Sequence, residues 1–332
     1  MSEFRQDIVT KNWVLIAQGR DKRPTDFKQL AASPIEMPEI SKECAFCPGN
    51  EEKTGQEIVR YPETGDWQVR VVPNKYEAVG HIIGKRTEDF YISRPGIGDH
   101  EVVISRYHNQ PVAQQDIELI DTTLRAYIDR YHDLALHDEV QYIHIIQNHG
   151  MQAGASVVHP HSQIFAIPFF PHRISGEISG TRDFFEVNNA CVYCEMIMFE
   201  MKEGSRVIFD TPDFLVVAPY ASKMPFEIHI LPKIHRSSFS KITISERKAL
   251  AWVMKDVFGR LYERMKNPAY NYYIHTLPTR LSSGRRTFSD QECYHWHIVV
   301  LPRVNVWAGF ELGTGIEINV IDPNEAVKIL ND

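Results

Sequence analysis

The chain has 332 residues, of which 43% are hydrophobic and 24% charged, with 18 Gly and 19 Pro. This composition excludes a disordered or collagen-like chain and suffices for a sizeable core in about two domains, or in one domain of two halves. A net charge of −7 excludes the strongly basic field of a general nucleic-acid binder, although a local cluster of donors can still bind a small anion.

The sequence carries no sign of a membrane segment. No stretch approaches the roughly 18 consecutive apolar residues of a membrane helix. Residues 1–7 are polar and lack the apolar region of a signal peptide. We therefore expect a cytoplasmic protein that binds neither nucleic acid nor membranes.

The first half predicts a mixture of strands with one long helix. Strands are expected over residues 7–18, 69–72, 100–105, 140–146 and 164–167, with a Pro-containing surface excursion over 19–43. Apolar residues recur at helical spacing between residues 114 and 137, which predicts a long helix. Residues 149–156 are rich in Gly and Ala and predict a loop.

The second half repeats this order of elements. Strands are expected over 214–218, 226–232, 270–275 and 295–301, and a long helix over 244–265. Such an internal repeat predicts an α+β fold of two similar halves, each an antiparallel sheet with one long helix packed on it. We place the boundary near residues 172–188, so that the halves span about 1–175 and 185–332.

Four of the five cysteines occur as two CxxC pairs. In a reducing compartment such pairs indicate metal binding or redox chemistry rather than structural disulfides, and the 15 histidines favour metal binding. Cys44 and Cys47 would form a Cys₂His₂ zinc site with His108 and His159. Four protein ligands leave no open position, so this zinc would be structural. The alternative is a buried CxxC turn with unrelated histidines.

The second pair, Cys191 and Cys194, predicts a second site of the same kind. Its histidines would be His235, on a turn that corresponds to the one in the first half, and His295. His229 competes with His235, but it lies within an expected strand. One or two structural zinc ions per chain are therefore expected.

The densest group of chemically active residues is the string His159-Pro160-His161-Ser162-Gln163, which follows Asn148 and Ser156. On an extended chain, residues i and i+2 face the same side, so one histidine can hold metal while the other meets substrate. His161 followed by Gln163 suggests a nucleophile with a stabilising side chain. The alternative is a pair of structural histidines.

These motifs resemble the galactose-1-phosphate uridylyltransferase branch of the histidine-triad superfamily, which includes ADP-glucose phosphorylase. The resemblance covers nearly the whole chain. The segments that carry it are 13–15, 19–24, 44–47, 72–74, 156–163, 191–194, 295–297 and 308–315. The His-Pro-His-x-Gln string is highly specific to this branch, whereas CxxC alone is not.

The resemblance implies that His161 attacks the α-phosphorus of a nucleoside diphosphate sugar and holds the nucleotide until a second sugar 1-phosphate takes it. By the same resemblance, the His159 carbonyl fixes the tautomer of His161, and Gln163 donates to a phosphoryl oxygen. Ser156 would bond the departing phosphate, and Asn148 would hold the nucleotide phosphates or their loop. The main hypothesis is exchange of UMP between UDP-glucose and galactose 1-phosphate.

Five further positions match binding residues of the family. Arg20 and Arg23 would reach phosphates from the neighbouring subunit of a homodimer, and guanidinium groups suit phosphate. Asn74 would lie near the base and ribose. Phe310 and Glu311 would line the sugar. Exposed arginines in a polar loop are the alternative for the first two.

One departure from the family and one difference between the two halves keep other hypotheses open. Lys75 follows Asn74 where the uridylyltransferases carry Asp, which leaves an ADP-sugar phosphorylase that passes AMP to phosphate as the first alternative. The second half lacks Gln after its histidine pair, which leaves a zinc-stabilised nucleotide-binding protein without turnover as the second. His297, the counterpart of His161, is expected to be vestigial or structural. Some uridylyltransferases have an iron site of carboxylate and histidine ligands, but the cysteine pair here favours zinc.

Overall fold

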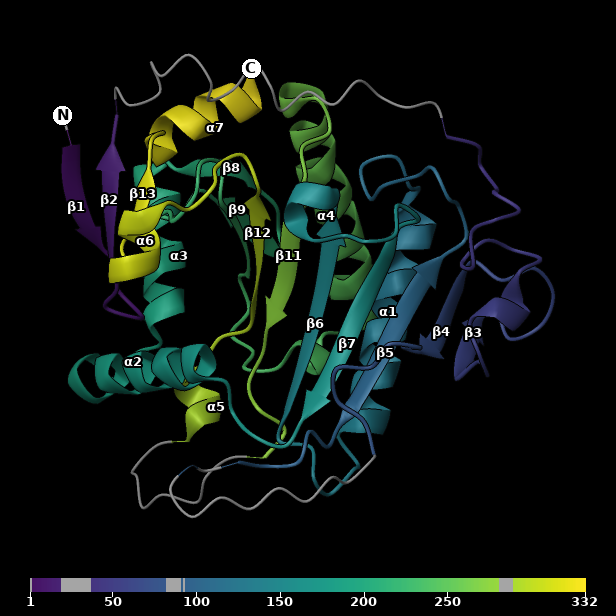
Figure 1. The fold of residues 1–332 in the computed structure, drawn as a ribbon. Coiled ribbons are helices and arrows are strands. Elements are labelled where there is room, and N and C mark those ends of the chain that lie inside the picture. Colours follow the sequence, from purple (N-terminus) through teal and green to yellow (C-terminus); the bar gives the residue numbers. More distant parts are fainter. Residues whose placement is uncertain (1, 19–36, 82–90, 92, 281–288) are drawn as a thin grey trace.

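A computed structural model describes residues 2–18, 37–81, 91, 93–280 and 289–332. Its main feature is a ten-stranded antiparallel sheet (Figure 1). The strand order is β3 (Val59–Tyr61), β4 (Val69–Pro73), β5 (Asp99–Ser105), β7 (His161–Ile167), β6 (Tyr142–His149), β11 (Tyr270–His275), β12 (His297–Pro302), β10 (Ile228–Pro232), β9 (Phe214–Val217) and β8 (Val207–Asp210).

The sheet consists of two halves with the same order of strands outward from its centre. The order is β6-β7-β5-β4-β3 on one side and β11-β12-β10-β9-β8 on the other. β6 and β11 join the halves, with Gln147 opposite Tyr272. The predicted α+β fold of two repeats is therefore confirmed, and the two repeats share one continuous sheet. Residues 172–188, the expected boundary, form helix α2 (His172–Asn188).

Two long helices, α1 (Ile117–Leu134) and α4 (Ile244–Met265), pack side by side on one face of the sheet (Figure 1). Local sequence starts both helices. The side chain of Asp116 accepts from the Leu119 amide at 2.7 Å, and Thr243 and Glu246 form a capping box. The apolar faces of both helices and the facing side of the sheet form the main core.

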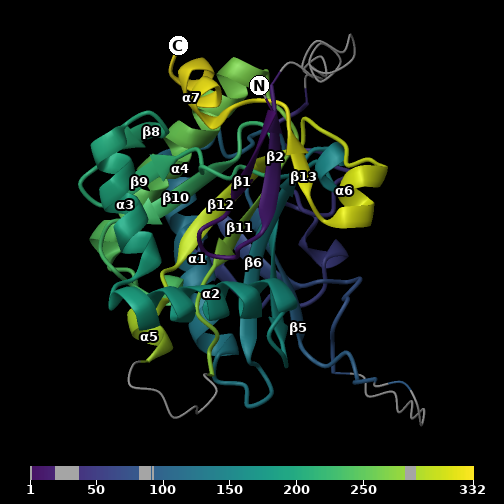
Figure 2. The ribbon, with the colours of Figure 1, turned by 90° about the vertical axis from the view of Figure 1, so that its left-hand side faces the viewer.

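A small second sheet joins the two chain ends and lies in front of the main sheet in Figure 2. It contains β1 (Ser2–Gln6), β2 (Trp13–Ala17) and β13 (Glu317–Asn319). The expected strand over 7–18 is wrong in its first part, because the Asp7 carboxylate accepts from the Val9 and Thr10 amides and turns the chain between β1 and β2.

The remaining helices are short. They are α3 (Val192–Glu203), α5 (Asp290–Cys293), α6 (Gly309–Thr314) and α7 (Pro323–Asn331), with 3₁₀ turns at Glu51–Lys53, Met151–Ala153 and Phe239–Lys241. Among the described residues, no helix is both long and apolar enough to cross a membrane.

Side chains alternate between the two faces of the sheet along β7, and this places His161 and Gln163 on one face. Ile164 and Ala166 point into the core under α1, and Ser162 points the same way. His161, Gln163 and the residues in step with them therefore lie on the opposite face of the sheet. In the second half this opposite face is covered by α3.

Candidate active site

His161 begins β7 with its ring held in one orientation. Its Nδ1–H donates to the carbonyl oxygen of His159 at 2.8 Å, which leaves the lone pair on Nε2. Nε2 has no hydrogen-bond partner among the residues that the structure describes. Burial lowers the pKa of His161, and the bond to the carbonyl opposes this only in part. The ring is therefore neutral at pH 7 and has the tautomer that a nucleophile needs.

Gln163 and Asn74 both contact the side chain of His100, a residue that the sequence analysis did not single out. The ring of His100, on β5, lies with Nε2 2.8 Å from Gln163 Oε1 and 3.0 Å from Asn74 Nδ2. His100 also stacks on Phe165, with ring centroids 3.9 Å apart. The structure thus brings these side chains together on the face of the sheet that carries His161.

Asn148 and Ser156 belong to the segment that leads into the histidine string. Asn148 follows Gln147, which pairs with Ser162, so Asn148 lies beside His161 on the same face. Its Oδ1 accepts from Asn271 at 2.7 Å. Ser156 lies exposed in the loop between β6 and β7. The roles assigned to these two side chains stay predictions.

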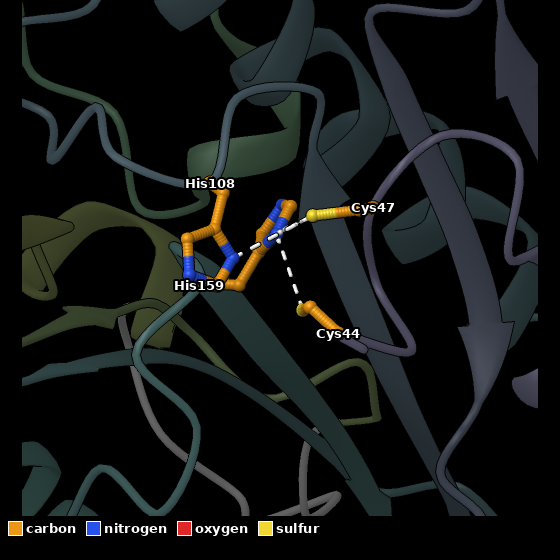
Figure 3. Close-up of side chains that lie close together, drawn as sticks. All are labelled: Cys44, Cys47, His108 and His159. Atoms are coloured by element: carbon orange, nitrogen blue, oxygen red, sulfur yellow. Dashed lines mark hydrogen bonds between the residues drawn. The ribbon is translucent and has the colours of Figure 1, made fainter. Parts of the chain in front are cut away.

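Cys44, Cys47, His108 and His159 converge as predicted (Figure 3). Their four ligand atoms all lie within 4.8 Å of one another. The Cys47 sulfur is 3.5 Å from Nδ1 of both histidines, and the Cys44 sulfur is 3.6 Å from Nδ1 of His159. A tetrahedral ion with the bond lengths of zinc would place sulfur and nitrogen ligands about 3.6 Å apart. The group can therefore hold such an ion.

The surroundings of His159 complete this site and connect it to the nucleophile. Its Nε2–H donates to the Ser105 carbonyl at 2.6 Å, which turns Nδ1 toward the cysteines. Burial lowers the pKa of His159 to about 4, so Nδ1 carries no proton at pH 7. Phe46, between the cysteines, contacts His161 edge-on, with ring centroids 5.2 Å apart. An ion here would fix the backbone whose carbonyl orients His161.

The second group, Cys191, Cys194, His235 and His295, also converges. The Cys194 sulfur is 3.5 Å from Nδ1 of His235 and 3.7 Å from Nδ1 of His295. The Nε2–H groups of the two histidines donate to backbone carbonyls at 2.9 and 2.8 Å. His235 rather than His229 lies in this group, as expected, and His229 lies in β10 and donates to Glu227, the residue before that strand.

Two expected binding residues lie apart from the strand of His161, and two others lie outside the part of the chain that the structure describes. Arg20 and Arg23 lie outside the described residues. Phe310 and Glu311 lie on α6, beside β13 and apart from β7 (Figure 1). The Glu311 carboxylate accepts from the Ala308 amide at 3.0 Å and so closes the first turn of its own helix.

The sequence analysis missed a third possible metal-binding group, Glu177, His275 and His297. All three are buried, and His275 Nδ1 lies 3.0 Å from the carboxylate of Glu177. His297 repeats the geometry of His161, because its Nδ1–H donates to the His295 carbonyl at 3.1 Å. The repeat could have indicated His275, which occupies the place of Asn148. A cavity of ≈ 510 Å³ lies over this group.

These features together define a class of protein. A neutral imidazole with a bare nitrogen can attack phosphorus, an amide beside it can donate to a phosphoryl oxygen, and a buried Cys₂His₂ group can hold the strand that carries both. Two repeats in one α+β sheet, of which the first carries all three features, define a transferase of the histidine-triad kind.

Comparison with known proteins gives the family. The model of the galactose-1-phosphate uridyl transferase N-terminal domain matches residues 1–171, and that of the C-terminal domain matches residues 177–309. ADP-glucose phosphorylase of Arabidopsis thaliana is 34% identical over 99% of this chain and 92% of its own length. Galactose-1-phosphate uridylyltransferase of Thermotoga maritima is 28% identical over 100% of this chain and 98% of its own.

Solved structures agree. The ADP-glucose phosphorylase of Arabidopsis thaliana with bound ADP-glucose superposes with a TM-score of 0.84 and 32% identity, covering 100% of this chain and 98% of that one. A solved uridylyltransferase superposes with a TM-score of 0.76 and 25% sequence identity, covering 100% of this chain and 97% of that one. The chain belongs to the galactose-1-phosphate uridyl transferase family, and it is an enzyme of the transferase class.

Proposed function

We propose that the protein transfers a nucleotidyl group in two steps through a covalent nucleotidyl-His161. In the first step Nε2 bonds the α-phosphorus while the bond from that phosphorus to the sugar 1-phosphate breaks, and the bonding electrons leave on the sugar phosphate. In the second step a phosphate oxygen of the acceptor bonds the phosphorus, and the electrons of the P–N bond return to the ring. The bare Nε2 of His161 is the observation that carries this proposal.

The main hypothesis for the substrates is UDP-glucose as donor and galactose 1-phosphate as acceptor. A sugar 1-phosphate leaves as an anion and needs no general acid, which suits an amide at Gln163 rather than a third histidine. Asn148 and Ser156 would bind the phosphates, and Asn74 would contact the nucleoside. These assignments rest on the family and, for Asn148 and Asn74, on the face of the sheet that they share with His161.

The second candidate is transfer of AMP from ADP-glucose to phosphate. It is supported by the relative named ADP-glucose phosphorylase, which is 34% identical against 28% for the Thermotoga maritima enzyme, and by its higher TM-score. Lys75, in place of the aspartate that uridylyltransferases carry, fits the same candidate.

Incubation with one labelled nucleotide sugar at a time distinguishes the candidates. UDP-glucose labelled in the α-phosphate should label the protein on His161 without an acceptor, and galactose 1-phosphate should then remove the label. Intact-protein mass spectrometry identifies the nucleotide by its mass. Labelling by ADP-glucose alone, with removal by inorganic phosphate, would replace the main hypothesis by the second. Labelling by neither would favour a nucleotide-binding protein without turnover.

A homodimer is part of this proposal. Because α6 lies apart from β7 within one chain, Phe310 and Glu311 could reach a sugar on His161 only across an interface, as the resemblance implies for Arg20 and Arg23.

Complementation tests the dimer. His161→Asn and the double variant Arg20→Ala/Arg23→Ala should each be inactive alone. Co-expressed, they should regain about a quarter of the wild-type activity, because random pairing makes half of the dimers mixed and each mixed dimer has one complete site of two. The activity should elute with differently tagged mixed dimers. No recovery in purified mixed dimers would contradict a shared site.

The metal ions are proposed to be two structural zinc ions, held by the two Cys₂His₂ groups. The five cysteines are free, as zinc ligands and a reducing cytoplasmic location require. Elemental analysis should find about two zinc per chain. Iron in place of one zinc would instead favour the group at Glu177, His275 and His297 as the second site.

A further inference from the structure

His100 lies where it can control the side chain of Gln163. It is 7% exposed, on the face of the sheet that carries His161, and its ring stacks on Phe165. The register pairs His100 with Phe165, so the ring lies diagonally across from Gln163. Only one atom pair, His100 Nε2 and Gln163 Oε1 at 2.8 Å, joins the two side chains.

A backbone amide determines which ring nitrogen carries the proton. The Ala78 N–H donates to His100 Nδ1 at 3.1 Å, and a backbone amide can only donate. Nδ1 therefore has no hydrogen, and the neutral ring carries its hydrogen on Nε2. That hydrogen points to Gln163, so the atom that accepts it must be the amide oxygen. Burial lowers the pKa of His100, and the bond to Gln163 offsets this only in part, which keeps the ring neutral.

Asn74 does not compete for this hydrogen. Its Oδ1 accepts from the Tyr76 amide at 2.9 Å, so the group that faces His100 Nε2, at 3.0 Å, is its NH₂, which can only donate. Because the neutral ring must carry one hydrogen and Nδ1 accepts from Ala78, this contact joins two donors and is not a hydrogen bond. Gln163 is thus the acceptor for Nε2–H among the described residues.

The consequence concerns the other end of the Gln163 amide. With the oxygen bound to His100, the NH₂ group points away from the ring, and it has no hydrogen-bond partner among the described residues. Without a donor at His100, the side chain could turn over and present its oxygen, which would repel a phosphoryl oxygen instead of binding it. One hydrogen bond therefore selects between a stabilising and a repelling orientation.

The second half of the sheet supports this coupling. Glu227 takes the place of His100 there, and Val299 takes the place of Gln163. Ser105 lies five residues after His100, and Pro232 lies five residues after Glu227. The carbonyl of each accepts a hydrogen bond from a metal-site histidine of its own half, so His100 and Glu227 occupy equivalent positions. The second half therefore lacks both the histidine donor and the amide that this donor would orient.

We propose that His100 is a positioning residue, which holds the Gln163 amide with its NH₂ group toward the phosphoryl group that His161 accepts. The inference rests on the proposed nucleotidyl transfer for its catalytic consequence, but the orientation itself is a property of the free protein.

Two variants of His100 separate its two hydrogen bonds. In His100→Asn the side-chain oxygen takes the place of Nδ1 and keeps the Ala78 contact, but nothing donates to Gln163. In His100→Gln the terminal NH₂ takes the place of Nε2 and can donate again. We expect His100→Asn to slow single-turnover nucleotidylation by the labelling nucleotide sugar by about 10-fold or more, with little change in its Kd. His100→Gln should recover most of the rate.

A double-mutant cycle shows whether His100 acts through Gln163. Gln163→Ala alone should slow the step by about 100-fold. Adding His100→Asn to it should cost less than about 3-fold more, because no amide is left to orient. A wild-type rate in His100→Asn, or single effects that multiply in the double variant, would overturn the proposal. Equal losses in His100→Asn and His100→Gln would also overturn it.

A measurement without activity separates this inference from the proposed function. ¹⁵N spectra of protein labelled in its imidazole rings should show His100, identified by its absence in His100→Asn, with hydrogen on Nε2 only. Hydrogen on Nδ1 would overturn the orientation even in an active enzyme. The expected tautomer in a protein that no nucleotide sugar labels would leave the orientation standing and reject the nucleotidyl transfer.

Discussion

His161→Asn should abolish the covalent nucleotidyl-protein and lower the rate of exchange by roughly 10⁴-fold or more, as loss of a nucleophile does in other covalent enzymes. The asparagine NH₂ takes the place of Nδ1 and can still donate to the His159 carbonyl, so the strand and the metal group beside it should keep their geometry. The change removes only the atom that bonds phosphorus. Label retained on acid-quenched protein and steady-state exchange measure the two effects.

His297→Asn is the matched control, since His297 makes the same bond to the preceding carbonyl in the second half. That position lacks the amide partner, because Val299 stands where the first half has Gln163. We expect His297→Asn to form the labelled intermediate. If His161→Asn were labelled normally and His297→Asn were not, the nucleophile would lie in the other half of the sheet.

The sequence predicted best those features that local periodicity and repetition determine. The helix expected over 244–265 and the strand over 270–275 have those bounds in the structure, because a capping box and a regular apolar stripe define the helix. The helix expected over 114–137 is shorter, since Asp116 caps it at its start. The repeat itself predicted two halves, but sequence periodicity does not encode that β6 and β11 pair into one sheet.

The candidate site also contains some residues that local sequence predicted and others that it could not predict. The Cys₂His₂ groups were predictable because cysteine pairs in a repeated context narrow the choice of histidines, and both groups converge. His100 was not, because its contact with Gln163 depends on strand register, which no motif records. Glu177 and His275 come from elements far apart in the chain and meet only through packing. Glu311 closes a turn of its own helix through the amide of Ala308, which lacks the hydroxyl of a capping-box residue, so no motif indicated this role.

Loss of the metal ions should affect the two halves differently. Cys47→Ser should lose one zinc per chain, lower Tm by roughly 10 °C or more, and leave the remaining folded protein inactive. Cys47 is fully buried and belongs to one metal-binding group with His108 and His159. His108 follows β5, and His159 precedes β7. Without the ion, the His159 carbonyl that orients His161 loses the metal bond that holds its side chain, and only the hydrogen bonds to Ser105 remain near it. Elemental analysis, calorimetry and nucleotidylation on the same preparation measure the three effects.

Cys194→Ser is the matched variant in the second half. It should also lose one zinc and lower Tm, since a structural zinc contributes to folding directly. Its ion, however, would hold the loop at His235 and the start of β12, which carry no part of the nucleotidyl site. Activity per folded molecule should therefore persist below the lowered Tm. Equal inactivation by both variants at a temperature where both are folded would mean that the ions stabilise the whole sheet rather than the nucleophile's own strand. Retention of two zinc ions by either variant would remove that cysteine from the ligand set.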